Sequence, residues 1–241
     1  MAARDSLFNQ DKVNEDFRFT DKVAEVFDDM LNRSVPNYGQ VIAMTAQILE
    51  KFLKPHDRVY DLGCSTGSTL LELARRLEPV HLNFVGIDNS PAMIKKAALK
   101  AEMYSKKNKI QFIERDIADA KIENAGAIIL NYTLQFIRPI VRPDFLKKIH
   151  AALRPGGVLI LSEKTISHDP KLNRIFIDFY LNFKRTQGYS EIEITKKREA
   201  LENVLIPFSI AENSKMLIDA GFASSETFSQ WFNFVSFVAI K

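Results

Sequence analysis

The sequence of 241 residues contains a single cysteine, Cys64. An intrachain disulfide is therefore excluded, and with it the small secreted domains that depend on several disulfides. The sequence also lacks paired cysteines and the H-E-x-x-H pattern. Because these are the common zinc-ligand spacings, we expect no metal site.

Long hydrophobic runs are absent too. No window approaches the roughly 18 consecutive apolar residues of a membrane-spanning helix, and the charged N-terminal stretch has no apolar segment of signal-peptide length. The 33 basic and 30 acidic residues give a net charge of only +3, too small a bias to favour nucleic acid or an anionic membrane as a partner. We therefore expect a cytoplasmic protein that binds neither.

The rest of the composition is that of an ordinary globular protein, with 46% hydrophobic and 26% charged residues. No repeat, low-complexity segment or linker rich in Pro, Gly and Ser divides the chain. We expect residues 1–241 to form one domain.

Two amphipathic helices are predicted before the first strand. Apolar residues recur at helical spacing over 23–31 and again over 41–53, and Pro36 separates the two runs. This segment, residues 1–55, either packs on the core or forms a lid over a site.

From residue 58 onward, short apolar strands alternate with helices. The predicted strands are 58–63, 82–88, 110–116, 125–131, 158–164, 227–232 and 234–240. This pattern predicts an α/β fold with a mostly parallel sheet covered by helices on both faces. Residues 166–206 break the alternation and are predicted to form a helical insertion, with a capping-box signature at Ser190 and Glu193.

The stretch Gly63-Cys64-Ser65-Thr66-Gly67 allows two interpretations. G-x-S-x-G is the nucleophile-elbow pattern of α/β-hydrolases, in which Ser65 would attack substrate. Here, however, the pattern follows the first strand of the sheet, no HGGG-type segment is present, and His168 is the one loop candidate for a catalytic histidine. The hydrolase interpretation is therefore disfavoured.

A ligand cradle is the second interpretation of the same loop. Glycines in a strand-to-helix turn let a ligand approach free backbone N–H groups. Asp88 ends the next strand 21 residues after Gly67, where a carboxylate accepts hydrogen bonds from two ribose hydroxyls. The G-x-x-x-G spacing lacks the three glycines of a dinucleotide fingerprint, and Asp61 adds negative charge beside the loop. S-adenosylmethionine, which carries a sulfonium and an ammonium, is favoured over NAD.

Four stretches, YDLGCSTGS, GIDNS, RDI and LRPGGVLILSE, occur in the order that resembles the class I S-adenosylmethionine-dependent methyltransferase fold. Others resemble carboxy-S-adenosyl-L-methionine synthases, a bacterial family of that fold: VAEVFDDMLNRSVPNY, IDNSPAMI, LNYTLQF, FKRTQGYSE and KKREALENV. The resemblance runs from near the N-terminus to the last strand. It implies a Rossmann-like, seven-stranded sheet with an N-terminal helical lid (1–55) and a helical insertion (166–206).

The resemblance also implies an activity. Enzymes of this family transfer the carboxyl released from prephenate to the methyl carbon of S-adenosylmethionine, which gives carboxy-S-adenosyl-L-methionine and phenylpyruvate. A partner enzyme uses the first product to modify wobble uridine in tRNA. We accordingly expect a homodimer that uses S-adenosyl-L-methionine and prephenate. Two alternatives stay open: an ordinary methyltransferase acting on a small acid, and a non-catalytic binder of S-adenosylmethionine.

The residues that hold the amino-acid end of the cofactor in this family match positions near the first strand. The resemblance implies that Tyr38 closes over the cofactor, and that Gly63, Cys64 and Ser65 contact its amino-acid end through backbone and hydroxyl. In this interpretation Ser65 lines a pocket and attacks nothing.

The nucleoside end is matched by residues that follow the second, third and fourth strands. The resemblance implies that Asp88 holds the ribose and that Asn89 lies near the adenine. Asp116 and Ile117 would take the edge of the adenine, and Asn131 would lie where cofactor and substrate meet.

Arg198 follows two lysines in the stretch KKR, a pattern that is by itself typical of a solvated helix face. The resemblance implies instead that its guanidinium binds the carboxylate of the modified cofactor, within one subunit or across two. Charge-assisted bonds of about 1.5–3 kcal/mol would distinguish the carboxylated cofactor from the plain one. We expect Lys196 and Lys197 to face solvent or to attract acidic substrate in general.

Overall fold

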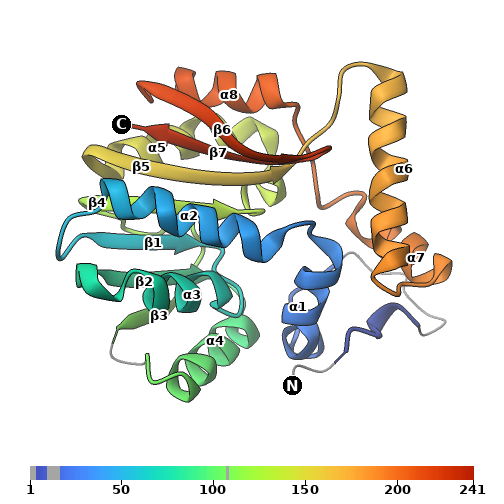
Figure 1. The fold of residues 1–241 in the computed structure, drawn as a ribbon, viewed down its shortest axis with the longest axis horizontal. Helices are drawn as coiled ribbons and strands as arrows, with labels where there is room; N and C mark the ends of the chain where they lie inside the picture. The colour runs from blue at the N-terminus through green and yellow to red at the C-terminus, as the bar shows by residue number, and fades with distance from the viewer. Residues whose placement is uncertain (1–3, 10–16, 107–108) are drawn as a thin grey trace.

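The computed structural model describes residues 4–9, 17–106 and 109–241, so parts of the predicted 1–55 segment lie outside the described residues. A seven-stranded sheet forms the centre of the molecule (Figure 1). Its strands are β1 (Arg58–Leu62), β2 (Asn83–Asp88), β3 (Ile110–Glu114), β4 (Ala125–Asn131), β5 (Leu153–Lys164), β6 (Ser224–Trp231) and β7 (Phe234–Ile240).

The strands lie in the order β3-β2-β1-β4-β5-β7-β6. Strands β1 to β5 are mutually parallel, and β7 lies antiparallel between β5 and β6. The order reverses between β1 and β4, and the carboxyl ends of parallel strands on either side of such a point form a crevice for ligands. The predicted α/β, Rossmann-like fold with a mostly parallel seven-stranded sheet is confirmed.

Helices cover both faces of the sheet. They are α1 (Asp21–Ser34), α2 (Tyr38–Phe52), α3 (Ser68–Arg76), α4 (Pro91–Met103), α5 (Arg142–Ala152), α6 (Pro170–Thr186), α7 (Glu191–Leu201) and α8 (Ile210–Asp219). One face packs against α2 and α3, and the other against α5 and α8. In β4, Ile128 and Leu130 enter one core and Ala127 and Ile129 the other. This explains why the central strands show continuous apolar runs.

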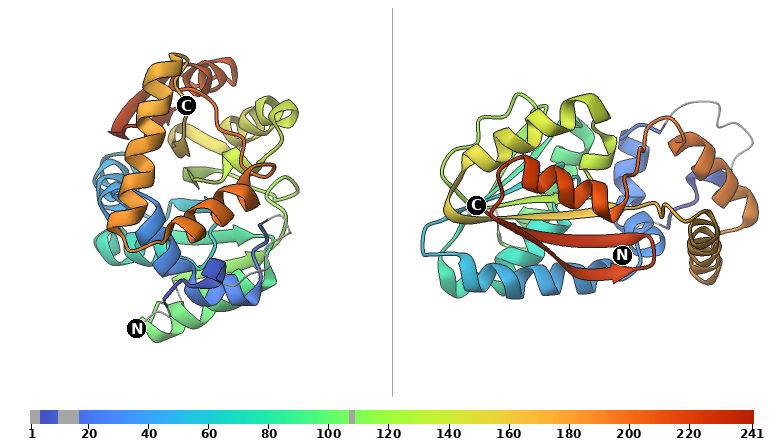
Figure 2. Two further views of the ribbon diagram at one scale, coloured as in Figure 1. Left: turned by 90° about the vertical axis from the view of Figure 1, so that its right-hand side faces the viewer. Right: turned by 90° about the horizontal axis from the view of Figure 1, so that it is seen from above.

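The predicted N-terminal segment divides into two parts. Helix α2 packs on the sheet through Ile42, Ala46 and Leu49. Helix α1 instead stands beyond the carboxyl ends of the strands, beside α6 and α7 (Figures 1 and 2). These three helices therefore cap the edge at which ligands bind in this class of sheet.

The insertion is anchored to the sheet by aromatic rings. The ring centroid of Phe179 lies 4.6 Å from that of Phe232, and the centroid of Tyr180 lies 4.9 Å from that of Phe234. Both partners belong to the β6–β7 hairpin, so α6 is fixed to the last two strands. The predicted capping box of Ser190 and Glu193 is present and begins α7.

None of the helices in the described ranges is long and apolar enough to span a lipid bilayer.

Strand β5 begins five residues earlier than predicted, at Leu153. The pairing with β4 shifts in register between Ala125 and Ala127, which leaves residues 154–157 as a bulge. Arg154 in this bulge donates hydrogen bonds to Asp57, with its Nη2 atom 2.7 Å from Asp57 Oδ2. The side chain of Asp57 lies directly against Gly126, where an added Cβ would come within 2.6 Å of it.

We predict that Gly126→Ala destabilises the fold by about 1–3 kcal/mol, because the new methyl group displaces Asp57 from Arg154. Urea unfolding measures this change. Gly39→Ala is the matched control, since nothing lies within 4 Å of an added Cβ there and α2 gains up to about 1 kcal/mol from the better helix former. Equal stability of the two variants would contradict the packing at Gly126.

Candidate ligand site

A cavity of about 1130 Å³ lies at the carboxyl edge of the sheet, and residues of α1 and α7 form part of its lining. All ten residues that the sequence singled out line it: Tyr38, Gly63, Cys64, Ser65, Asp88, Asn89, Asp116, Ile117, Asn131 and Arg198. They come from six separate parts of the chain, so the fold brings them together. The contact of each with a ligand stays a prediction.

The glycine loop between β1 and α3 turns through left-handed backbone. Gly63, Ser65 and Gly67 have φ values of +76°, +49° and +74°. A Cβ at Gly63 would lie 2.6 Å from the side chain of Thr133. Glycine is required there on two counts, the positive φ and the close approach.

Asp88 holds this loop in place. One oxygen of its buried carboxylate accepts a hydrogen bond from the Ser65 N–H at 2.9 Å, and the other accepts from the Ser90 N–H at 2.9 Å. Burial raises the pKa of Asp88, and these two N–H groups lower it only in part. Because a carboxylate oxygen has more than one lone pair, each can still accept from a ribose hydroxyl.

Asp61 adds a second carboxyl group to the same end of the cavity. Its side chain is buried, and burial together with the nearby Asp88 raises its pKa to about 7. A cation bound beside the two groups would favour their charged forms and lower both pKa values. This end of the cavity is therefore suited to a positively charged ligand.

Tyr38 and Asn131 meet at Thr69. The hydroxyl groups of Tyr38 and Thr69 lie 3.3 Å apart, and Asn131 Nδ2 donates to Thr69 Oγ1 at 3.4 Å. Asn131 Oδ1 is buried and has no hydrogen-bond partner among the described residues. Since buried polar atoms are normally satisfied, this oxygen is a free acceptor for a ligand donor.

Asp116 and Asn89 lie at the exposed rim of the cavity. Asp116 Oδ1 accepts a hydrogen bond from the Ala118 N–H at 2.8 Å, which fixes the carboxylate after β3. Among the described residues its other oxygen accepts no hydrogen bond, so it is available for the predicted contact with an exocyclic amine.

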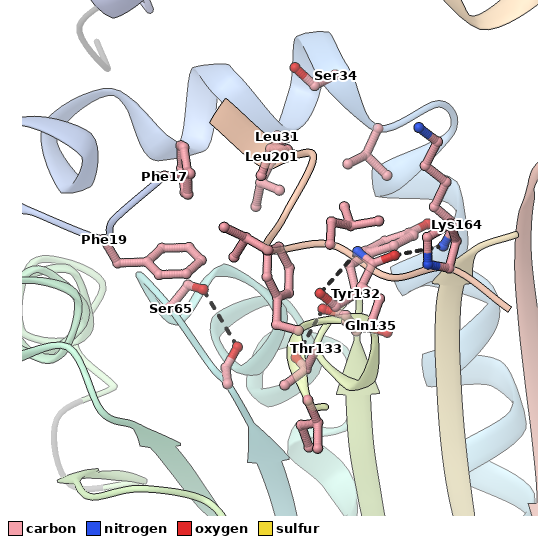
Figure 3. Close-up of a pocket in the computed structure, with 18 of the residues that line it drawn as sticks. Phe17, Phe19, Leu31, Ser34, Ser65, Tyr132, Thr133, Gln135, Lys164 and Leu201 are labelled. Carbon is pink, nitrogen blue, oxygen red and sulfur yellow. Dashed lines mark hydrogen bonds between the residues drawn. The ribbon is translucent and has the colours of Figure 1, made fainter. Parts of the chain in front are cut away.

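No sequence pattern predicted the aromatic rings that lie over the glycine loop. The ring of Phe19 makes edge contacts with those of Phe17, Phe27 and Phe136, at centroid distances of 5.1–5.9 Å. Phe19 lies next to Ser65 (Figure 3), and its carbonyl accepts a hydrogen bond from Ser90 Oγ at 2.7 Å. Phe17 and Phe19 precede α1, where no helical periodicity exists to reveal which side is buried.

Asp28 of α1 accepts hydrogen bonds from the glycine loop and from the start of α3. Its carboxylate accepts hydrogen bonds from Thr66 Oγ1 at 2.5 Å and from Ser68 Oγ at 2.8 Å, and it pairs with Lys100 Nζ of α4 at 2.7 Å. Burial opposes the charge on Asp28, but Lys100 and the two hydroxyls outweigh it and lower its pKa. These hydrogen bonds and the ion pair join α1, the glycine loop and α4.

Helix α7 carries Arg198 at the exposed edge of the cavity, and Arg198 forms no ion pair with any described residue. The expectation that Lys197 faces solvent was wrong. Lys197 is buried, and its Nζ lies 3.0 Å from Ser34 Oγ and 3.5 Å from Asp5 Oδ2. The ion pair of Lys197 with Asp5 could not be predicted from the sequence, because the two residues are 192 positions apart.

The nucleophile-elbow interpretation finds no support in the geometry. Among the described residues, Ser65 Oγ hydrogen-bonds only to the carbonyl of Gly63, at 3.5 Å. His168 is exposed, lies 3.9 Å from Glu212, and does not line the cavity. Ser65 therefore has no base, whereas the cradle formed by Gly63, Ser65 and Asp88 leaves room for a nucleoside.

Comparisons with known proteins agree with this geometry. A family model described as a methyltransferase domain matches residues 59–157. A carboxy-S-adenosyl-L-methionine synthase of Desulfotalea psychrophila is 57% identical over 99% of this chain and 97% of its own length. One of Nautilia profundicola is 47% identical, over 98% of this chain and 99% of its own. The chain belongs to the carboxy-S-adenosyl-L-methionine synthase family. It is accordingly an enzyme, a transferase that uses S-adenosylmethionine.

Solved structures support the fold of these synthases. A putative S-adenosyl-L-methionine-dependent methyltransferase of Methanococcus maripaludis has a TM-score of 0.63 at 17% identity, over 95% of this chain and 97% of its own. A putative O-methyltransferase of Nostoc punctiforme has a TM-score of 0.65 at 18% identity and is matched over 92% of this chain. This chain spans 60% of the length of the latter.

We predict that Ser65→Ala lowers the affinity for S-adenosylmethionine by no more than about tenfold, since one neutral hydrogen bond contributes about 0.5–1.5 kcal/mol. Gly63→Ala should abolish binding, because its Cβ meets Thr133 and its φ is positive. Calorimetric titration measures both affinities. A complete loss of turnover in Ser65→Ala with intact binding would restore the nucleophile interpretation.

We predict that Asp28→Asn destabilises the protein by about 1–3 kcal/mol at neutral pH, because Lys100 loses its charged partner. The lowered pKa of Asp28 means that this contribution is present above its usual pKa of 3.8 and is lost as pH falls through the folded value. Urea unfolding at pH 7 and pH 3 measures the difference. Glu25→Gln, an exposed site on the same helix, is the control and should change neither value.

Proposed function

We propose that this enzyme transfers the carboxyl released from prephenate to the methyl carbon of S-adenosylmethionine, and that the products are carboxy-S-adenosyl-L-methionine and phenylpyruvate. The first product would serve a partner enzyme that modifies wobble uridine in tRNA in the cytoplasm. One observation carries the proposal: a single cavity contains both a nucleoside cradle with buried carboxyl groups and an arginine without an ionic partner among the described residues.

The balance of the reaction follows from the chemistry of prephenate. The bond to its ring carboxyl breaks, the electron pair makes the ring aromatic, and the ring hydroxyl leaves. The leaving hydroxide and the methyl proton combine as water, while the carbon of the released carbon dioxide bonds to the methyl carbon. S-adenosylmethionine supplies that carbon, which becomes nucleophilic on losing its proton because the adjacent sulfonium stabilises the charge left behind.

The chain's own residues bind, orient and exclude water. Asp88 would hold the ribose hydroxyls, and Asp61 would attract the cationic end of the ligand. The ring of Phe19 lies beside the glycine loop and packs on Phe136, where it would help to keep bulk water from a short-lived carbon dioxide. Arg198 would form a charge-assisted fork with the new carboxylate as it appears.

A homodimer is part of the proposal, supported by an apolar patch on the insertion. Leu172 and Phe179 of α6 and Phe232 of the β6–β7 turn are each between 38% and 47% exposed. A second subunit would cover these side chains, which are unusual on the surface of a monomer.

We predict that Arg198→Met reduces the preference for carboxylated over plain S-adenosylmethionine by about 10- to 100-fold, because the lost bonds contribute about 1.5–3 kcal/mol. The affinity for plain S-adenosylmethionine should stay within about threefold. Competition binding of the two ligands measures the ratio. Arg174→Met on exposed α6 is the control and should leave the ratio unchanged.

The reaction itself is tested by mass spectrometry of the nucleoside formed from S-adenosylmethionine and prephenate. We expect a product heavier than S-adenosylmethionine by one carbon dioxide. Formation of S-adenosylhomocysteine together with a methylated acid would instead establish the methyltransferase alternative. An unchanged ligand preference in Arg198→Met would remove Arg198 from the mechanism.

A further inference from the structure

Two lysine side chains line the cavity on the side opposite the glycine loop. Lys164 ends β5 and Lys184 belongs to α6, and their Nζ atoms lie 4.9 and 4.8 Å from the centroid of the Tyr180 ring. In Figure 3, Lys164 lies across the cavity from Phe19 and Ser65. The cavity is therefore acidic at the glycine loop and basic at its opposite side, where β5 ends beside α6.

Neither lysine forms a direct ion pair with a described residue, although the charge of Asp5 acts on Lys184 from further away. In the described parts of the chain, no carboxylate lies within ion-pair distance of Lys164 or Lys184, whereas the neighbouring Lys197 has Asp5. The side chain of Lys184 is only 5% exposed. Burial, and then the charges of Lys197 and Lys164, lower the pKa of Lys184 to about 7, and burial also lowers the pKa of Lys164.

A buried ammonium group without a counter-ion is costly, and a bound anion would offset that cost. The two lysines are not needed to hold α6 in place, because the aromatic contacts of α6 with the β6–β7 hairpin already fix this helix. The rings of Tyr132 and Phe234 make an edge contact at 6.0 Å, and Phe234 also packs on Tyr180. The ammonium groups thus lie beside a wall of three aromatic rings.

We propose that Lys164 and Lys184 form a second anion subsite, which binds the carboxylate that the acidic substrate keeps, while its ring packs on Tyr180, Tyr132 and Phe234. This inference rests on the proposed function and deepens it. The substrate class is a small dicarboxylate with a ring: one carboxyl is transferred and ends beside Arg198, and the other stays on the leaving keto acid. Because one guanidinium cannot hold both groups, a separate cationic site is required.

The subsite is tested with phenylpyruvate as the probe, titrated calorimetrically into full-length enzyme saturated with S-adenosylmethionine. Lys184→Met keeps the length and apolar stem of the side chain and removes its charge. We expect the Kd for phenylpyruvate to rise about 10- to 100-fold, while the Kd for S-adenosylmethionine stays within twofold. Lys171→Met, at the exposed start of the same helix, is the control and should change neither.

The pH dependence separates charge recognition from a packing role. Lys184 is faced by Lys164 of β5, Lys197 of α7, Asp5 of the N-terminal segment and Tyr180 of its own helix. Because its pKa is about 7, Lys184 loses its proton as pH rises from 6 to 8.5, and the affinity of the wild type for phenylpyruvate should fall over this range. The fall should be smaller in Lys184→Met, and Lys164→Met should weaken phenylpyruvate binding in the same way.

The outcomes distinguish this inference from the proposed reaction. Binding of phenylpyruvate that depends on Lys184, without a carboxylated product in the assay above, keeps the subsite and overturns the reaction. A carboxylated product with unchanged phenylpyruvate affinity in Lys184→Met and Lys164→Met overturns the subsite alone. Absence of phenylpyruvate binding to the wild type, or an equal loss of affinity for S-adenosylmethionine, also overturns it.

Discussion

The candidate site depends on one carboxylate that holds two loops. Asp88 accepts hydrogen bonds from Ser65, which follows β1, and from Ser90, which begins α4 after β2. The first bond fixes a backbone turn that contains left-handed residues, and such a turn persists only where its surroundings determine it. Together with the hydrogen bonds that the Gly63 and Cys64 N–H groups donate to the carbonyl of Ile87, Asp88 sets the shape of this loop and its distance from the second strand.

Much of the fold was predictable because it rests on local patterns. Continuous apolar runs such as that of β4 require burial on both faces, and the Ser190–Glu193 box marks the start of α7 in the sequence itself. The glycine loop and the place of Asp88 could be predicted for the same reason, because their spacing along the chain is that of a strand, a turn and the end of the next strand. The assignment of Arg198 came from family resemblance, as its pattern indicates only an exposed helix.

What the sequence did not reveal depends on partners that are distant along the chain. Lys197 looked solvated because nothing near it in sequence is acidic, and Asp28 showed no sign that Lys100 would lie beside it. The early start of β5 has the same origin, since Arg154 is held by Asp57 from across the sheet. Pairs of this kind are created by tertiary folding, and single-sequence patterns contain no record of them.

The buried cluster around Asp5 has a consequence for the order of assembly. Asp5 accepts a hydrogen bond from Tyr189, 184 residues later, and Arg33 bonds to the carbonyl of Gln187. During synthesis Asp5 is made 184 residues before Tyr189, and β7, which lies inside the sheet, is made after both. The cap over the cavity can close only after residues 187–189 have been made, so a nascent chain that stops short of them has no finished pocket in which to trap a nucleoside.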